Sequence, residues 1–175
     1  MVLYHGTDEQ SARAILENGI DLFVGNIHTD FGQGFYLTTD ILMAKQWAQR
    51  KGLFTRGAIV SYQFDEEKAI KELRCREFKD ADLIWAQFIA NNRNGFRYAR
   101  MMNMSENNLR GQYELVIGQI ADGQVSSITR TLQAEMAAVD ETVLSNFRRK
   151  EYSTQYSFHS KPAIAKLQNG RLRLI

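Results

Sequence analysis

Two short segments bring together residue types that could bind a flat, polar ligand. Residues 3–7 (Leu-Tyr-His-Gly-Thr) place a histidine before a glycine, where a ligand can approach the backbone closely. Residues 30–39 (Asp-Phe-Gly-Gln-Gly-Phe-Tyr-Leu-Thr-Thr) join a glycine-rich turn to two aromatic residues, and Trp47 follows. Aromatic faces beside a tightly turning backbone suit stacking on a planar ring, although Phe35 and Tyr36 would serve equally well in a core. A strand-end histidine is also more often structural than ligand-binding.

The sequence lacks the residue patterns of several common kinds of binding and catalytic site. The histidines and the single cysteine have no zinc-ligand spacing, so no metal site is expected. There is no P-loop and no nucleophile elbow. The glycines at 32 and 34 are not a dinucleotide fingerprint, because the third glycine is missing and a strand is expected to follow them.

The hydrophobic pattern predicts the elements that must position these segments. Helix caps are expected at Thr7, within Thr38–Asp40 and at Ser160, with Gly19 and Gly170 as helix ends. An apolar stripe over 128–147 predicts a further helix. Short strands are expected at residues 2–5, 35–37, 58–64, 73–78, 113–120, 152–159 and 171–175, and a helix at 80–92. Short strands outnumber β-α-β units, so an α+β fold is expected, and the absence of repeats and linkers predicts one domain, 1–175.

Composition limits the partners of the protein. The 175 residues carry a formal net charge of +2 and contain 44% hydrophobic residues. No apolar run approaches the roughly 20 residues of a membrane span, and no signal peptide is recognisable, so a cytoplasmic protein without membrane contact is expected. Basic residues gather in two regions, 93–110 and 141–175, the second including Arg148, Arg149 and Lys150. The first is either a surface with ion pairs to Glu106 or a contact for the NAD pyrophosphate or an acceptor. The second is either a solvated helix end or a surface for an acceptor or partner, nucleic acid included.

In order and spacing, four features resemble the ADP-ribosyltransferase superfamily, and most closely its diphtheria-toxin and poly(ADP-ribose)-polymerase branch. They are Leu-Tyr-His-Gly-Thr at 3–7, Ile-Leu-Glu-Asn-Gly-Ile at 15–20, Gly-x-Gly-x-Tyr-Leu-Thr at 32–38, and an aromatic residue, Trp47, eleven positions after Tyr36. The remainder is similar to small bacterial domains of that superfamily, especially at 113–118 and 155–159. The resemblance implies two small antiparallel sheets with flanking helices, with NAD bound in the cleft between them.

The resemblance also implies roles for individual residues. His5 would bond the adenosine ribose hydroxyl of NAD, and the Gly6 backbone would hold the nicotinamide amide. Tyr36 and Trp47 would face the two sides of the nicotinamide ring. Thr7 and Gly34 complete the NAD-binding motifs, and the loop 20–31 would lie over the dinucleotide. A serine of the family that helps to hold the amide is replaced by Ala44.

The third catalytic position departs from the family pattern. The catalytic glutamate of the family falls on Gln155, so the expected triad is His5, Tyr36 and Gln155. Glutamine can bond a ribose hydroxyl, but it supplies neither a negative charge nor a general base at neutral pH. Either positioning by Gln155 suffices, or Glu114 or Glu151 assists, or turnover is weak.

The expected function is therefore an NAD-dependent ADP-ribosyltransferase, a glycosyltransferase that moves ADP-ribose to a protein or nucleic-acid acceptor. By family analogy, it would be a bacterial toxin with an antitoxin partner, or a phage-defence factor. The alternatives are an NAD glycohydrolase, a degenerate module that only binds NAD or ADP-ribose, and a nucleic-acid-binding module with no NAD role. The acceptor and the oligomeric state stay open.

Overall fold

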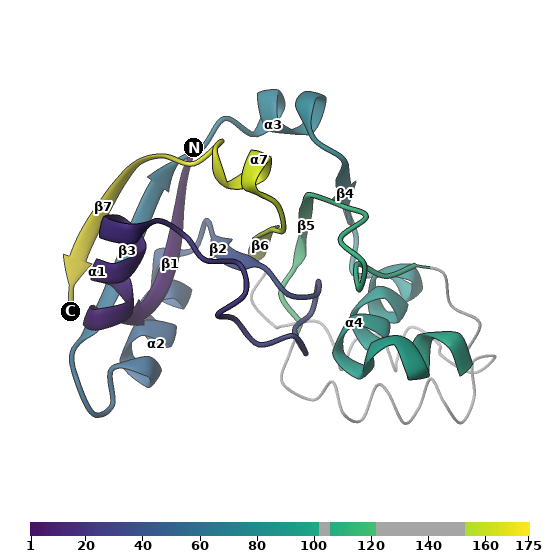
Figure 1. Ribbon diagram of the computed structural model, residues 1–175, viewed down its shortest axis with the longest axis horizontal. Coiled ribbons are helices and arrows are strands. Elements are labelled where there is room, and N and C mark those ends of the chain that lie inside the picture. Colours follow the sequence, from purple (N-terminus) through teal and green to yellow (C-terminus); the bar gives the residue numbers. More distant parts are fainter. Residues whose placement is uncertain (102–105, 122–152) are drawn as a thin grey trace.

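The computed structural model describes residues 1–101, 106–121 and 153–175 (Figure 1). The expected helix at 128–147, the basic triplet at 148–150 and Glu151 lie outside these ranges. The described elements form an α+β fold, as expected. Its helices are α1 (Glu9–Asn18), α2 (Ile41–Lys51), α3 (Glu66–Glu72), α4 (Leu83–Met101) and α7 (Lys161–Ile164).

Seven strands form one sheet in the order β4-β5-β6-β2-β1-β3-β7. Their bounds are β1 (Val2–Asp8), β2 (Phe35–Thr38), β3 (Gly57–Gln63), β4 (Cys75–Glu77), β5 (Leu115–Gln119), β6 (Thr154–Phe158) and β7 (Gln168–Leu174). All described pairings are antiparallel except β4 with β5. The strands thus hydrogen-bond into a single sheet where two separate antiparallel sheets were expected.

The continuity of that sheet is weakest between β1 and β2. β1 pairs with β3 along its whole length, whereas its only paired residue toward β2 is Tyr4, opposite Thr38. Continued antiparallel pairing would set His5 against Leu37 and Gly6 against Tyr36, but these residues are not paired. The two strands therefore diverge at the segments that sequence analysis singled out.

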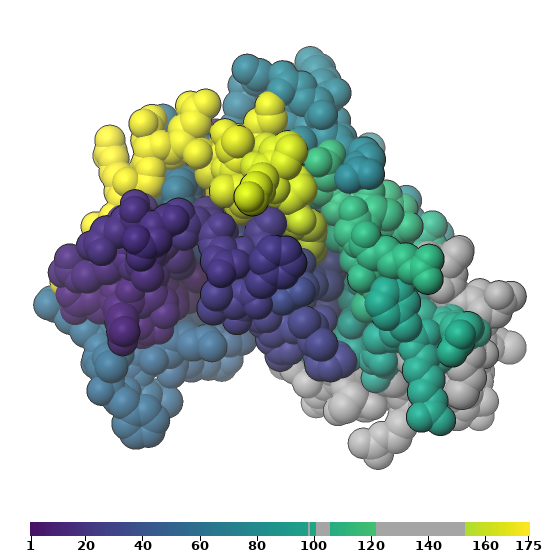
Figure 2. All heavy atoms as spheres, viewed as in Figure 1, coloured from purple at the N-terminus to yellow at the C-terminus, as the bar shows by residue number. Residues whose placement is uncertain are grey.

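The helices cover both faces of the sheet. α2 packs on β1 and β3 through Ala44, Ala48 and Ile59, while α1 and α7 cover a second cluster that includes Leu3 and Phe158. α4 and the loop before β2 enclose a third cluster, rich in aromatic residues: Phe31, Phe78, Trp85 and Phe88. In Figures 1 and 2 the loop between α1 and β2 crosses the front of the molecule, between the α1 side and the α4 side.

Several local predictions need correction. β1 continues to Asp8, and Asp8 rather than Thr7 caps α1, because its carboxylate accepts the Ser11 amide at 2.8 Å. α4 begins at Leu83 and continues through the polar segment after residue 92, with a kink at Gly95 (φ 78°). The last helix is only four residues long, so Gly170 lies inside β7 instead of ending a helix. Helix α3 had no sequence prediction. The caps at Asp40 and Ser160 are confirmed.

Candidate functional site

The gap between β1 and β2 is bridged by the side chain of His5. Its Nδ1 lies 2.7 Å from the Tyr36 carbonyl oxygen, and its ring packs on Phe35 with centroids 4.5 Å apart. Because a carbonyl only accepts, Nδ1 carries the hydrogen, and Nε2 of the neutral ring is left as an acceptor. Burial lowers the pKa of His5, and the charge of Lys51 acts in the same direction. The neutral imidazole therefore offers Nε2 to a hydroxyl donor.

Tyr36 is held at both ends. Its backbone carbonyl accepts from His5, and its hydroxyl accepts from the Phe31 amide at 3.0 Å and donates to the Gly32 carbonyl at 2.6 Å. Burial raises the pKa of Tyr36 far above its usual value, so the phenol stays protonated. The ring is fixed by the loop 29–32 and is only partly exposed.

Tyr36 and Gln155 share one face of the sheet. Tyr36 lies opposite Ser157 and Thr38 opposite Gln155 in the β2–β6 ladder, and directly opposed side chains project to the same face. Tyr36 and Gln155 are thus diagonal neighbours, with an expected separation of roughly 7–8 Å. The fold brings together two members of the expected triad from positions 119 residues apart.

Gln155 is tied to a residue that sequence analysis did not single out. Its Nε2 donates to Asp30 Oδ2 at 2.9 Å, which assigns the orientation of the amide and leaves the carbonyl oxygen with no partner among the described residues. Asp30 also accepts from Arg93 Nε at 2.6 Å and forms an ion pair with the same guanidinium. Both Gln155 and Asp30 are more than 90% buried. The only sequence signal for Asp30 was its place at the start of the glycine-rich turn.

Trp47 lies on the flank of α2 that faces the gap. Ala44 and Ala48 rest on Gly6, and the flank with Lys45 and Gln49 faces β3 and β7. Trp47 is on the opposite flank, one turn from Lys51, whose charge acts on His5. Trp47 is 46% exposed, and its ring lies under the Arg50 guanidinium, 5.5 Å from the centroid. The described ring contacts of Tyr36 and Trp47 do not include one between the two rings.

The remaining predicted binding residues have structural roles in this arrangement. A Cβ on Gly6 would lie 2.9 Å from the Ala48 nitrogen and even closer to the Ala44 carbonyl oxygen. The absence of a side chain at Gly6 therefore allows α2 to pack directly on β1. A Cβ on Gly34 would lie 2.7 Å from the His159 ring. Thr7 is buried, with its hydroxyl 3.5 Å from the Asp8 carboxylate.

Glu114 does not lie beside Gln155. Its backbone carbonyl accepts from His159, whereas Gln155 pairs with Gly118, four positions along β5 and roughly 13 Å away. Its carboxylate accepts from the Arg74 amide and from Ser160, and these bonds lower the pKa of Glu114. Among the described residues, the carboxylate that contacts the Gln155 side chain is that of Asp30.

Of the first basic region, only Arg93 reaches this network. Arg110 lies over the Phe96 ring, 5.5 Å from its centroid, and Arg97 and Arg100 are exposed. Glu106 forms an ion pair with Arg76 at 3.0 Å and with no described arginine of this region.

His159 predicts a pH dependence of stability. Its Nδ1 donates to the Gln33 carbonyl, its Nε2 is buried without a described partner, and burial lowers the pKa of His159 to about 4. Between its unfolded pKa near 6.5 and about 4, the unfolded chain binds the proton and the folded chain does not. The free energy of unfolding should therefore fall by up to about 3 kcal/mol as the pH drops through that window. Denaturant unfolding at several pH values measures this, and a slope unchanged in His159→Gln would contradict the assignment.

Comparisons with known proteins identify the family of the chain. The family DUF3990, described as a protein of unknown function, matches residues 1–169, so the chain belongs to this family. No curated protein and no solved structure matches it. Within the described ranges, no helix is long and apolar enough to cross a membrane, and no three metal-ligating side chains cluster.

Proposed function

We propose that the protein is an NAD-dependent ADP-ribosyltransferase whose site lies where β1 and β2 diverge. The observation that carries this proposal is that His5 bonds the Tyr36 carbonyl where β1 and β2 diverge, while Tyr36 and Gln155 share one face of the sheet. Where the strands diverge, the Tyr36 carbonyl is paired with the His5 side chain instead of with the backbone of β1. Because β1 and β2 share a single pair, the strand groups β1-β3-β7 and β4-β5-β6-β2 are joined only through Tyr4 and Thr38, which also supports the proposal.

NAD would be held by this chain's own groups. Nε2 of His5 accepts a ribose hydroxyl, and the Tyr36 ring stacks on the nicotinamide with Trp47 on its other side. The backbone of residues 5–7 that faces β2 supplies polar partners for the amide. Arg50, already over Trp47, adds positive charge at the rim near the pyrophosphate.

In the reaction, the bond between nicotinamide and the ribose C1′ breaks, and its electron pair leaves with neutral nicotinamide. A nucleophilic oxygen or nitrogen of the acceptor forms the new bond to C1′ and loses a proton to solvent. The Gln155 carbonyl oxygen accepts the nicotinamide-ribose hydroxyl and fixes the sugar. Asp30 is a positioning residue, because its bond to Nε2 turns the carbonyl oxygen toward the ligand.

NAD affinity tests the site. We expect His5→Ala and Tyr36→Ala each to weaken NAD binding by about tenfold or more, because one loses a ribose bond and the other the stacking surface. Tyr36→Phe keeps the ring and should bind within about threefold of wild type. Calorimetric titration measures the affinities. NAD should also quench Trp47 fluorescence, since Trp85 is fully buried.

Folding controls separate binding from collapse of the site. Each variant is first compared with wild type by thermal unfolding, and only folded variants are titrated. Wild-type affinity in both folded alanine variants would refute the NAD site. If NAD binds, incubation with labelled NAD and cell lysate then distinguishes labelled macromolecules from free ADP-ribose, which would indicate hydrolysis instead.

A further inference from the structure

β7 is an edge strand with an open side. The Ile175 amide donates to the Gly57 carbonyl at 3.0 Å, so alternate residues 171, 173 and 175 direct their backbone groups to β3. The backbone N–H and C=O groups of Leu172 and Leu174 therefore face away from the sheet. No described strand pairs with that side, which is visible at the left edge of Figure 1. Such an edge is a template for a further strand.

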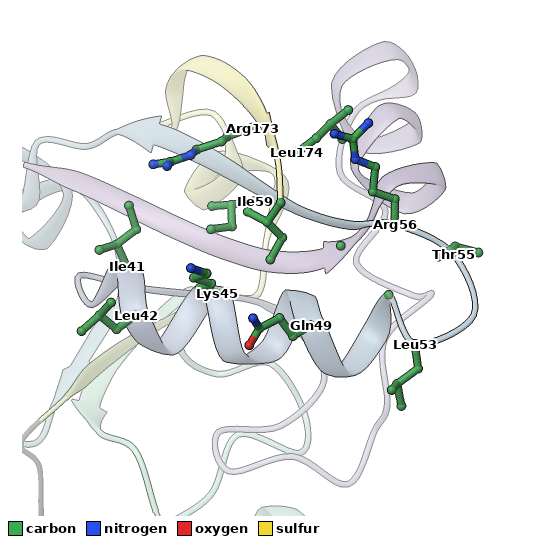
Figure 3. Close-up of a pocket in the computed structure, with 13 residues that line it drawn as sticks. Ile41, Leu42, Lys45, Gln49, Leu53, Thr55, Arg56, Ile59, Arg173 and Leu174 are labelled. Carbon is green, nitrogen blue, oxygen red and sulfur yellow. The ribbon is translucent and has the colours of Figure 1, made fainter.

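The side chains of β7 differ between its two faces. Leu172 and Leu174 pack against the cluster under α1. Arg171 and Arg173 are both exposed, and Arg173 lines a groove of about 840 Å³ between β7, β3 and α2. In Figure 3, Lys45 points from α2 toward the strands, and Arg173 and Arg56 lie on either side of Ile59.

The groove combines three positively charged side chains with apolar side chains. Its cations are Lys45, Arg56 and Arg173, and it contains no Asp or Glu side chain. None of the three forms an ion pair with a carboxylate of the described residues. Next to them, Leu42 and Leu53 are 67% and 74% exposed. Apolar side chains of this size favour a peptide over the phosphate backbone of a nucleic acid.

We propose that the β7 edge and this groove bind an extended acidic segment of a partner protein, which adds as an eighth strand. Its backbone pairs with Leu172 and Leu174. Residues on one side of that segment are acidic and face Arg171, Arg173 and Lys45, and alternate residues are apolar and extend the cluster under α1. The surface lies on the flank of α2 opposite Trp47, so it is separate from the proposed NAD site and does not depend on it.

A defined peptide tests this proposal. The probe is an acetylated and amidated peptide of about nine residues with alternating Glu and Val, a typical strand length. We expect it to bind the full-length protein, with an affinity that falls as salt is added. Hydrogen exchange followed by NMR should show new protection at the Leu172 and Leu174 amides. The variant Lys45→Glu/Arg173→Glu should weaken binding by about tenfold or more, while retaining the wild-type thermal unfolding.

Matched probes decide between alternatives. The same peptide with Lys in place of Glu tests the charge, and a copy that is N-methylated on alternate residues tests strand pairing. The proposal is overturned by no binding of the Glu/Val peptide, by equal binding of either control, or by protection elsewhere. It is also overturned if oligo-dT binds more tightly and loses affinity in the Lys45→Glu/Arg173→Glu variant, because that outcome assigns the surface to nucleic acid.

Discussion

Gly6→Ala is expected to lower the free energy of unfolding by at least about 3 kcal/mol, or to prevent folding. The added methyl group would lie 2.8 Å from the Ala44 carbonyl carbon and 2.9 Å from the Ala48 nitrogen, and closer still to the Ala44 carbonyl oxygen. These are backbone atoms of α2, so no side-chain rotation relieves the overlap. The helix has to move off β1, and the Trp47 flank moves with it.

Gly25→Ala is the matched control for this substitution. A Cβ there has only one neighbour, the Gly34 carbonyl oxygen at 3.5 Å, and the residue has no positive φ. Its stability should stay within about 0.5 kcal/mol of wild type. Urea unfolding of both variants makes the comparison. A loss below 1 kcal/mol for Gly6→Ala would show that close packing of α2 on β1 is not required.

Gln155→Glu is expected to destabilise the protein rather than simply restore a catalytic glutamate. The new carboxylate would replace the donor that now contacts Asp30 at 2.9 Å, and it would place two like charges together in a buried site. The loss should be about 2 kcal/mol at pH 7.5. Repulsion raises the pKa of one carboxyl, so the penalty grows with rising pH and should shrink at pH 5, where the pair shares a proton.

The double variant Asp30→Asn/Gln155→Glu separates charge repulsion from chemistry. Its Asn amide donates to the Glu carboxylate, so that hydrogen bond is kept with the donor and acceptor exchanged, and the Asn carbonyl oxygen can still accept from Arg93 although the ion pair is lost. We expect stability to recover by more than half of the loss in Gln155→Glu. If the proposed function holds, nicotinamide release from NAD should exceed that of wild type by about tenfold or more, because residue 155 then carries the charge that stabilises the transition state.

Two measurements assess these variants independently. Denaturant unfolding at pH 5 and pH 7.5 reports the interaction between residues 30 and 155, whether or not NAD is a substrate. Chromatographic detection of nicotinamide reports the reaction. Equal stability of Gln155→Glu and wild type at pH 7.5 would contradict the Asp30 contact, whereas recovered stability without faster release would indicate a module that only binds its ligand.

Many elements were predictable because their signals are local. The capping carboxylate of Asp40, the serine before Pro162 and the apolar runs of β3 and β5 each depend on neighbours within a few residues. The errors arose where pairing with a distant strand overrode such local signals. The boundary at Asp8 moved because β1 pairs with β3 up to Gly57, and Gly170 became part of a strand because its segment pairs with β3.

The residues of the proposed site were likewise predictable only where their signal is local. His5, Tyr36 and Trp47 could be selected from their type and spacing, since they lie within one stretch of 43 residues. Asp30 could not, because its role depends on Arg93 and Gln155, which are 63 and 125 residues away. A carboxylate in a glycine-rich turn is usually a turn residue, and nothing local distinguishes this one.

By itself, the sequence determined most of the segments, the caps at Asp40 and Ser160 and the residues proposed to touch a flat ligand, because propensity and side-chain chemistry act over short distances. Only the tertiary structure decided that β1 and β2 diverge after one pair, that Asp30 orients Gln155, and that the β7 edge stays open beside a basic groove. These features arise from pairing and burial between segments that are distant in the sequence. The free energy of such contacts depends on the tertiary packing and not on a local sequence pattern.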